Sequence, residues 1–114
     1  MAGFTRPVTF SRKSVRQRQA HEVIERLADR RRPLVLMGDF NCSFGTKDRT
    51  LSMLARGLHL RAYKPEATDM ASFPSRNKRF DWIMISGELA FCEYRTLPDV
   101  LSDHRAVVAT LRLV

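Results

Sequence analysis

The stretch Leu34-Val35-Leu36-Met37-Gly38-Asp39-Phe40-Asn41 decides how this chain folds. Its near-continuous apolar run is typical of a strand that is buried on both faces. A loop is expected from Gly38 to Gly45, so Asp39 and Asn41 follow the end of that strand. Folds of the α/β kind build their sites from polar side chains at the ends of buried strands. The stretch therefore indicates both a layered fold and a place for chemistry.

Helical patterns flank this strand on both sides. Ser14 can cap a helix from Val15 to about Arg30, in which apolar residues recur at spacings of three and four and form one stripe. Pro33 then ends that helix. After the strand, the pattern predicts a second helix over Lys47–Arg56 with Gly57 as its stop.

The rest of the chain is richer in strands. Weak patterning over Leu58–Arg79 predicts a long surface loop, and three strands are expected at Phe80–Ser86, Phe91–Leu97 and Arg105–Leu113. Residues 1–10 have no clear pattern and suggest an N-terminal arm or partial strand. This order predicts an α/β chain with α+β layering, in which two main helices pack on a mixed β-sheet.

The composition favours a basic, globular protein. The chain has 114 residues, of which 44% are hydrophobic, and its formal net charge is +8. No apolar run approaches the roughly 20 residues of a membrane span, and the start of the chain lacks the apolar core of a signal peptide, so a cytoplasmic location is the default. The charge favours polyanions such as nucleic acid, phosphorylated substrates or anionic lipid headgroups. A solvated face on the helix that precedes Pro33 explains the basic residues equally well.

The cysteines and two of the histidines point to no particular chemistry. Cys42 and Cys92 lie in neither a zinc-type nor a Cys-x-x-Cys spacing, and two buried free thiols are expected rather than a disulfide. His21 and His59 are expected to be surface or core residues rather than ligands.

Two short segments carry residues suited to phosphate chemistry. Asp39 and Asn41 fall on the same side of an extended backbone, although an ordinary Asx turn explains that pair equally well. Asp103 suits Mg²⁺, and His104 suits a phosphate oxygen or a proton transfer.

A catalytic imidazole also needs an orienting carboxylate on its other nitrogen. Asp81 is the candidate for His104, because an unpaired carboxylate within an apolar strand would be costly. A salt bridge from Asp81 to Arg79 or Lys78 is the structural alternative.

The motifs Gly38-Asp39-Phe40-Asn41, Phe80-Asp81-Trp82-Ile83 and Ser102-Asp103-His104 resemble, in this order, the endonuclease/exonuclease/phosphatase superfamily. That superfamily includes pancreatic-type deoxyribonuclease, and Phe73-Pro74-Ser75 also resembles its bacterial members. The resemblance implies the C-terminal half of a four-layer α/β sandwich, so that 11–114 would be a partial domain. It further implies a metal-dependent phosphoesterase, in which Mg²⁺ or Mn²⁺ assists the attack of water on a phosphodiester or phosphomonoester.

The same resemblance implies a role for each residue of these motifs. Asp39 would orient or deprotonate the attacking water, and Asn41 would bind a non-bridging phosphate oxygen. Asp103 would be the metal ligand. His104 would contact the phosphoryl group, held in position by Asp81. In the loop before Asp81, the basic side chains of Arg76 and Arg79 would bind substrate phosphate.

The sequence also departs from the family pattern. The N-terminal half of the family fold supplies an Asn and the Glu that is the principal metal ligand, and neither has a counterpart here. Arg6–Phe10 lacks a further family His. The resemblance therefore implies a partial site that binds Mg²⁺ weakly, and an exposed sheet face open to self-association or a partner. The alternative is a non-catalytic basic remnant that binds nucleic acid or pairs with a partner to complete the sandwich.

Overall fold

The computed structural model of this chain describes residues 12–101 and 103–114, so the expected arm at 1–10 and Ser102 lie outside the described residues. Two helices and five strands follow one another, with a single 3-10 turn between β2 and β3. The elements are α1 (Arg12–Leu27), β1 (Val35–Asp39), α2 (Thr50–Leu58), β2 (Leu60–Ala62), η1 (Pro74–Arg76), β3 (Asp81–Ser86), β4 (Leu89–Leu101) and β5 (His104–Leu113).

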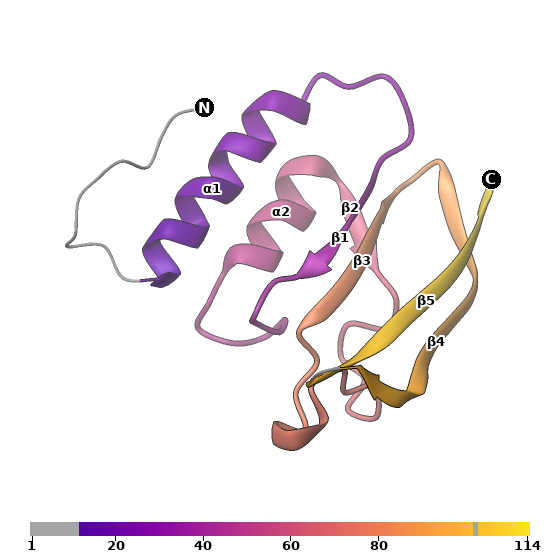
Figure 1. The fold of residues 1–114 in the computed structure, drawn as a ribbon. Coiled ribbons are helices and arrows are strands. Elements are labelled where there is room, and N and C mark those ends of the chain that lie inside the picture. The colour runs from indigo at the N-terminus through magenta and orange to yellow at the C-terminus, as the bar shows by residue number, and fades with distance from the viewer. Residues whose placement is uncertain (1–11, 102) are drawn as a thin grey trace.

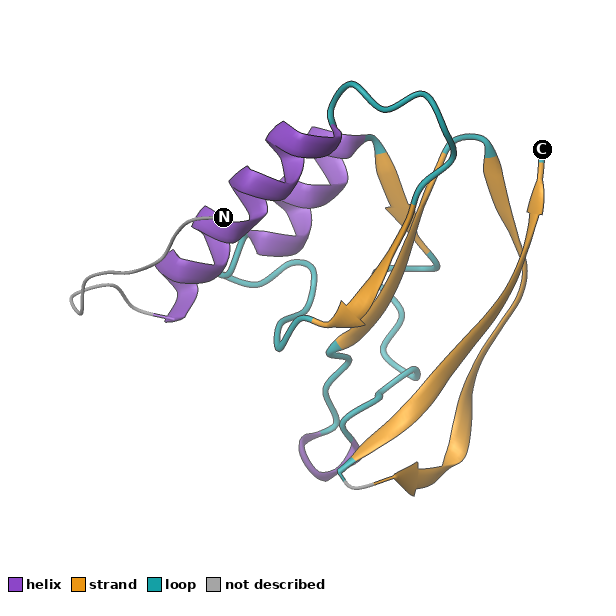
Figure 2. Ribbon diagram, turned by 45° about the horizontal axis from the view of Figure 1, so that its top comes forward, coloured by secondary structure: helices purple, strands orange, loops and turns teal. Residues whose placement is uncertain are grey.

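The elements form three layers. Figure 1 shows both helices on one side of the sheet β1-β3-β2, while the β4–β5 hairpin lies on the opposite side. Figure 2 shows the same layers from another angle, with the hairpin splayed away from the sheet. The expected α+β layering is confirmed. The expected mixed sheet is wrong for the described strands, because β3 runs antiparallel to both β1 and β2, and β4 runs antiparallel to β5.

The core lies between the helices and the sheet. It is built from buried side chains on α1, α2, β2 and β3, which include Ala20, Leu51, Leu54, Leu58, Leu60, Trp82 and Met84. The other face of the sheet is more open. Met37 on β1 is 63% exposed, so the prediction that this strand is buried on both faces is wrong. The physical reason is that the splayed hairpin leaves this face of β1 uncovered.

The second helix begins later and ends later than predicted. The Asp48 carboxylate accepts hydrogen bonds from the Thr50 amide (3.0 Å) and hydroxyl (2.6 Å), which fixes the start of α2 at Thr50. Negative charge at this end of a helix is favourable. The helix runs through Gly57 and ends at Leu58, because His59 takes the left-handed conformation (φ 55°) that stops it. Gly57 was therefore wrongly predicted as the stop.

Gly57 instead allows the two helices to approach closely. A Cβ at this position would lie 2.7 Å from Cδ1 and 2.8 Å from Cγ1 of Ile24 on α1. The first helix itself starts and ends earlier than predicted, at Arg12 and Leu27.

The segment predicted as a surface loop is partly internal. Leu60–Ala62 forms β2 at one edge of the sheet, and Ser72 and Arg79 are buried. The cysteine prediction is half correct: Cys42 and Cys92 are both free thiols, but only Cys42 is buried. Within the described residues, no helix is long and apolar enough to cross a membrane.

Substitution of Gly57 by Ala should destabilise the protein by about 1 kcal/mol, because overpacking against Ile24 outweighs the gain in helix propensity. In an Ile24→Ala background the sign should reverse, since the clash is gone and only the propensity gain remains. Urea unfolding of the four proteins in this double-mutant cycle measures the coupling. Equal effects of the Gly57 substitution in both backgrounds would contradict this packing.

The two thiols should differ sharply in reactivity. Burial, followed by the nearby Asp48 charge, raises the pKa of Cys42 to about 11, whereas Cys92 is exposed. Because the thiolate is the reactive form, iodoacetamide at pH 8 should alkylate Cys92 and leave Cys42 unmodified. Mass spectrometry of the native and the urea-unfolded Cys92→Ser variant provides the control: only the unfolded sample should be labelled.

Candidate active site

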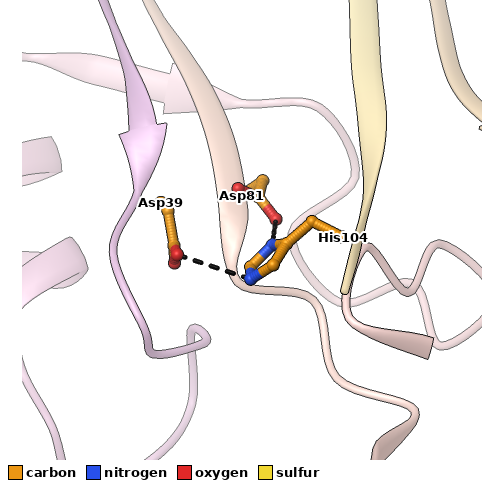
Figure 3. Close-up of side chains that lie close together, drawn as sticks. All are labelled: Asp39, Asp81 and His104. Atoms are coloured by element: carbon orange, nitrogen blue, oxygen red, sulfur yellow. Dashed lines mark hydrogen bonds and ion pairs between the residues drawn. The ribbon is translucent and has the colours of Figure 1, made fainter. Parts of the chain in front are cut away.

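Three strand ends meet at one corner of the molecule. Asp39 is the last residue of β1 and Asp81 the first of β3, and the two are paired in the antiparallel register. His104 is the first residue of β5, in the other sheet. Figure 3 shows the three side chains converging, with the imidazole between the two carboxylates. Residues far apart in the sequence are thus brought together by the packing of the hairpin against the sheet.

Each ring nitrogen of His104 faces a carboxylate. Nδ1 lies 2.6 Å from Oδ2 of Asp81, a short hydrogen bond. Nε2 lies 3.5 Å from Oδ2 of Asp39 and 3.8 Å from Oδ1 of Asp103. The contact expected between Asp81 and His104 is therefore present, in place of the alternative salt bridge from Asp81 to Arg79 or Lys78.

The surrounding carboxylates stabilise the charged form of the imidazole. The hydrogen bond that His104 donates to Asp81 is the main cause that raises the pKa of His104. The charges of Asp81, Asp39 and Asp103 act in the same direction, against desolvation. His104 therefore keeps its proton to a higher pH than an ordinary histidine does. A protonated imidazole here can donate a hydrogen bond from Nε2 while Asp81 holds Nδ1.

The cluster lines a cleft of about 350 Å³ between the open face of the sheet and β5. The walls combine the three polar residues with apolar side chains on β1, β3 and β5, which include Met37, Ile83, Ala106 and Val107. The Asp39 side chain is 40% exposed and the His104 side chain 24%. Both side chains are therefore accessible from the cleft.

Asn41 is oriented differently from the prediction. Its backbone amide donates a hydrogen bond of 2.9 Å to Oδ1 of Asp39, and its φ is 54°. This is an Asx turn, the alternative explanation of the pair, so the expectation of an extended backbone from Asp39 to Asn41 is wrong. The turn holds the Asp39 carboxylate in place. The Asn41 side chain is exposed beside Asp39.

Arg79 has a structural position rather than a place in the cleft. It is 7% exposed, and its guanidinium donates hydrogen bonds to the carbonyl oxygens of Tyr63 (2.6 Å) and Lys64 (2.7 Å). The guanidinium carbon lies 4.0 Å above the Trp82 ring. These contacts use both terminal nitrogens of the guanidinium and the face of the Trp82 ring, which favours a structural role for Arg79. Its contact with substrate stays a prediction. Arg76 is exposed at the end of η1.

The donor atoms at this corner suit a divalent cation. Asp39, Asp81 and His104 each offer a ligand atom, and these atoms lie within 4.8 Å of one another. Asp103, the predicted metal ligand, lies at the same corner, with Oδ1 3.8 Å from Nε2 of His104. Carboxylate oxygens are preferred by Mg²⁺ and Mn²⁺, so the residue types fit such an ion.

The sequence did not predict that Ser72 contributes to this site. The buried Ser72 hydroxyl accepts hydrogen bonds from the amides of Phe80 (3.1 Å) and Asp81 (3.0 Å), at the start of β3. A serine in a stretch with no clear periodicity carries no signal that would mark it. Its partners become visible only when the loop is folded against the sheet.

Comparison with known proteins identifies one family. The sequence profile of the Endonuclease/Exonuclease/phosphatase family matches residues 2–104, which include all three motifs. No curated protein and no solved structure matches the chain.

Replacing Asp81 by Asn should lower the pKa of His104 toward the ordinary value of 6.5, because the main cause of the raised pKa is removed. Since the folded-state pKa is raised, this interaction stabilises the fold fully below the ordinary pKa, and its contribution is lost as the pH rises through the folded-state value. Titration of the imidazole carbon-bound protons by NMR measures the pKa. Asp69→Asn, in the loop before β3, is the control and should leave it unchanged.

Proposed function

Because this chain belongs to the endonuclease/exonuclease/phosphatase family, we propose that it is a metal-dependent phosphoesterase that uses Asp39, Asp81, Asp103 and His104. Members of the family are hydrolases of the nuclease or phosphatase type, act on phosphate-containing substrates and are generally dependent on divalent metal ions. The observation that carries the proposal is the imidazole of His104 held by Asp81 at Nδ1 while Nε2 faces the open cleft.

The proposed reaction is the attack of water on a phosphoester. Asp39 accepts a proton from the water as the new P–O bond forms and the ester P–O bond breaks. The protonated His104 donates a hydrogen bond from Nε2 to a phosphoryl oxygen and stabilises the charge that develops there. Asp81 keeps the ring oriented for that contact.

A divalent cation completes this scheme. Asp103 would hold Mg²⁺ or Mn²⁺, and the ion would supply positive charge that neutralises the phosphoryl oxygens. With so few oxygen donors, we expect weak binding of the ion by the residues of this site alone. The amide of Asn41, on the turn beside Asp39, would donate to a non-bridging oxygen.

The basic turn before β3 extends the proposed substrate surface. Arg76 and Lys78 are exposed on the turn bounded by the bridge between Phe73 and Lys78. That turn lies beside the cleft, because the ring of Phe73 is centred 5.1 Å from the imidazole of His104. We therefore assign Arg76 to a phosphate next to the reacting one, as a polyanion such as nucleic acid would present.

The main alternative is a basic chain that binds nucleic acid without catalysis, or that is completed by a partner. Its support is the net charge of +8 and the open face of β1, where Met37 is 63% exposed. Two basic residues of the α1 region are, however, engaged within the fold: Arg16 pairs with Asp48, and Arg30 donates to the carbonyl of Leu58. We therefore propose catalysis first, by a partial domain over 11–114.

The test is hydrolysis of bis(p-nitrophenyl) phosphate with Mg²⁺ or Mn²⁺. His104→Ala and Asp39→Ala should each lower the rate at least about 100-fold, as expected when an acid–base group is lost. His21→Ala, which removes an exposed histidine on α1, should have no effect. Chelation with EDTA should abolish turnover.

Turnover that survives both site substitutions would contradict the proposal. Salt-sensitive DNA binding that persists in these variants without turnover would favour the alternative. Light scattering on the same samples gives the mass, which shows whether the active species is one chain or an assembly.

A further inference from the structure

We propose that Ser72 is a positioning residue that sets the distance between Asp81 and His104, an inference that rests on the proposed function for its catalytic consequence. Asp81 belongs to the sheet β1-β3-β2 and His104 to the separate β4–β5 sheet. Their 2.6 Å hydrogen bond therefore spans two sheets that strand pairing does not hold in register. Something other than a β-ladder must fix the two strand starts relative to each other.

The side chain of Ser72 holds the start of β3. Its hydroxyl oxygen accepts hydrogen bonds from the amides of Phe80 (3.1 Å) and Asp81 (3.0 Å). Ser72 is fully buried, so water cannot replace this acceptor. Two adjacent backbone donors at the beginning of the strand are therefore anchored on one oxygen atom, and the second of them belongs to the residue that binds the imidazole.

The backbone of Ser72 holds the start of β5. Its carbonyl oxygen accepts a hydrogen bond of 2.8 Å from the amide of Arg105, the residue after His104. The amide of Ser72 in turn donates to the carbonyl of Lys78 (3.0 Å), which ties it to the chain entering β3. One residue thus bonds to the peptide groups beside both partners of the site.

Phe73, the residue after Ser72, contacts the same two strand starts through its ring. The centroid of the Phe73 ring lies 5.1 Å from that of the His104 imidazole and 5.5 Å from that of Phe80. The covalent link between the two sheets, at Gly87 and Glu88, is at the far end of β3. At the opposite end, which carries Asp81, Ser72 links the two strand starts: its hydroxyl accepts from the amides of Phe80 and Asp81, and its carbonyl oxygen accepts from the amide of Arg105.

Ser86 provides a matched control at the opposite end of the same strand. It is also fully buried, and its hydroxyl oxygen accepts a hydrogen bond of 2.9 Å from the amide of Leu34. Ser86→Ala therefore removes a comparable buried acceptor without touching the site. A loss of stability alone would be shared by both substitutions, whereas a positioning effect is specific to Ser72→Ala.

The experiment compares wild type, Ser72→Ala and Ser86→Ala by NMR of the imidazole N–H protons, at a temperature at which all three are folded. In the wild type and Ser86→Ala, the Nδ1 proton of His104 should give a downfield, slowly exchanging resonance, as expected of a short hydrogen bond to a carboxylate. In Ser72→Ala that resonance should be lost. Its persistence in Ser72→Ala, or its equal loss in both variants, would overturn the proposal.

Amide hydrogen exchange of the wild-type protein keeps the proposal testable if Ser72→Ala does not fold. The amides of Phe80, Asp81 and Arg105 should exchange as slowly as the amide of Ile85 in the middle of the sheet, and rapid exchange of Asp81 or Arg105 would overturn the proposal.

A kinetic measurement separates this proposal from the proposed function. In Ser72→Ala the kcat for bis(p-nitrophenyl) phosphate should fall at least about tenfold with little change in KM, because misplaced groups cost rate more than binding. An unchanged kcat would overturn the positioning role. If the wild type itself is inactive, the proposed function fails, while the NMR and exchange results still decide whether Ser72 holds Asp81 and His104 together.

Discussion

The hydrogen bond between Nδ1 of His104 and Asp81 is the interaction on which the site depends. It forms across two sheets, so it requires that the start of β5 and the start of β3 be held together without the help of a shared ladder. The bond stabilises the charged imidazole and leaves Nε2 directed toward Asp39 and Asp103. Any displacement of the hairpin would break this arrangement, because a hydrogen bond weakens steeply with distance and angle.

The helices stabilise the site indirectly, by packing against the strand that carries Asp81. Leu51, Leu54 and Leu58 on α2 pack against the sheet and support Trp82 and Met84 on β3. Residues alternate across a strand, so burying Trp82 on the helix side directs Asp81 toward the cleft. Arg79 adds to this anchorage by lying over the Trp82 ring and bonding to the loop carbonyls. The same residues that build the core thus orient the carboxylate.

Local sequence patterns predicted the main helices and strands, but they did not reveal the positions of several individual residues. The first strand, both helices and the three C-terminal strands were all expected near their observed positions. Gly57 was expected to stop a helix, but α2 continues through it and ends where His59 takes the left-handed conformation. Ile24 of the neighbouring helix leaves no room for a side chain at Gly57. Arg79 was expected to bind substrate, since a basic residue in a polar stretch resembles a ligand-binding one. Its guanidinium instead donates to carbonyl oxygens of residues 63 and 64, in a loop whose path no local pattern describes.

The sequence by itself determined the family, through three short motifs whose order and chemistry suffice for recognition. It also determined the strands in or beside which Asp39, Asp81 and His104 lie, since apolar runs and the polar residues next to them are local properties. Only the tertiary structure decided that the three side chains meet and that Ser72 joins the two strand starts. These contacts depend on how the hairpin packs against the sheet, and that packing is set by long-range burial and hydrogen bonding rather than by any neighbouring residues in the chain.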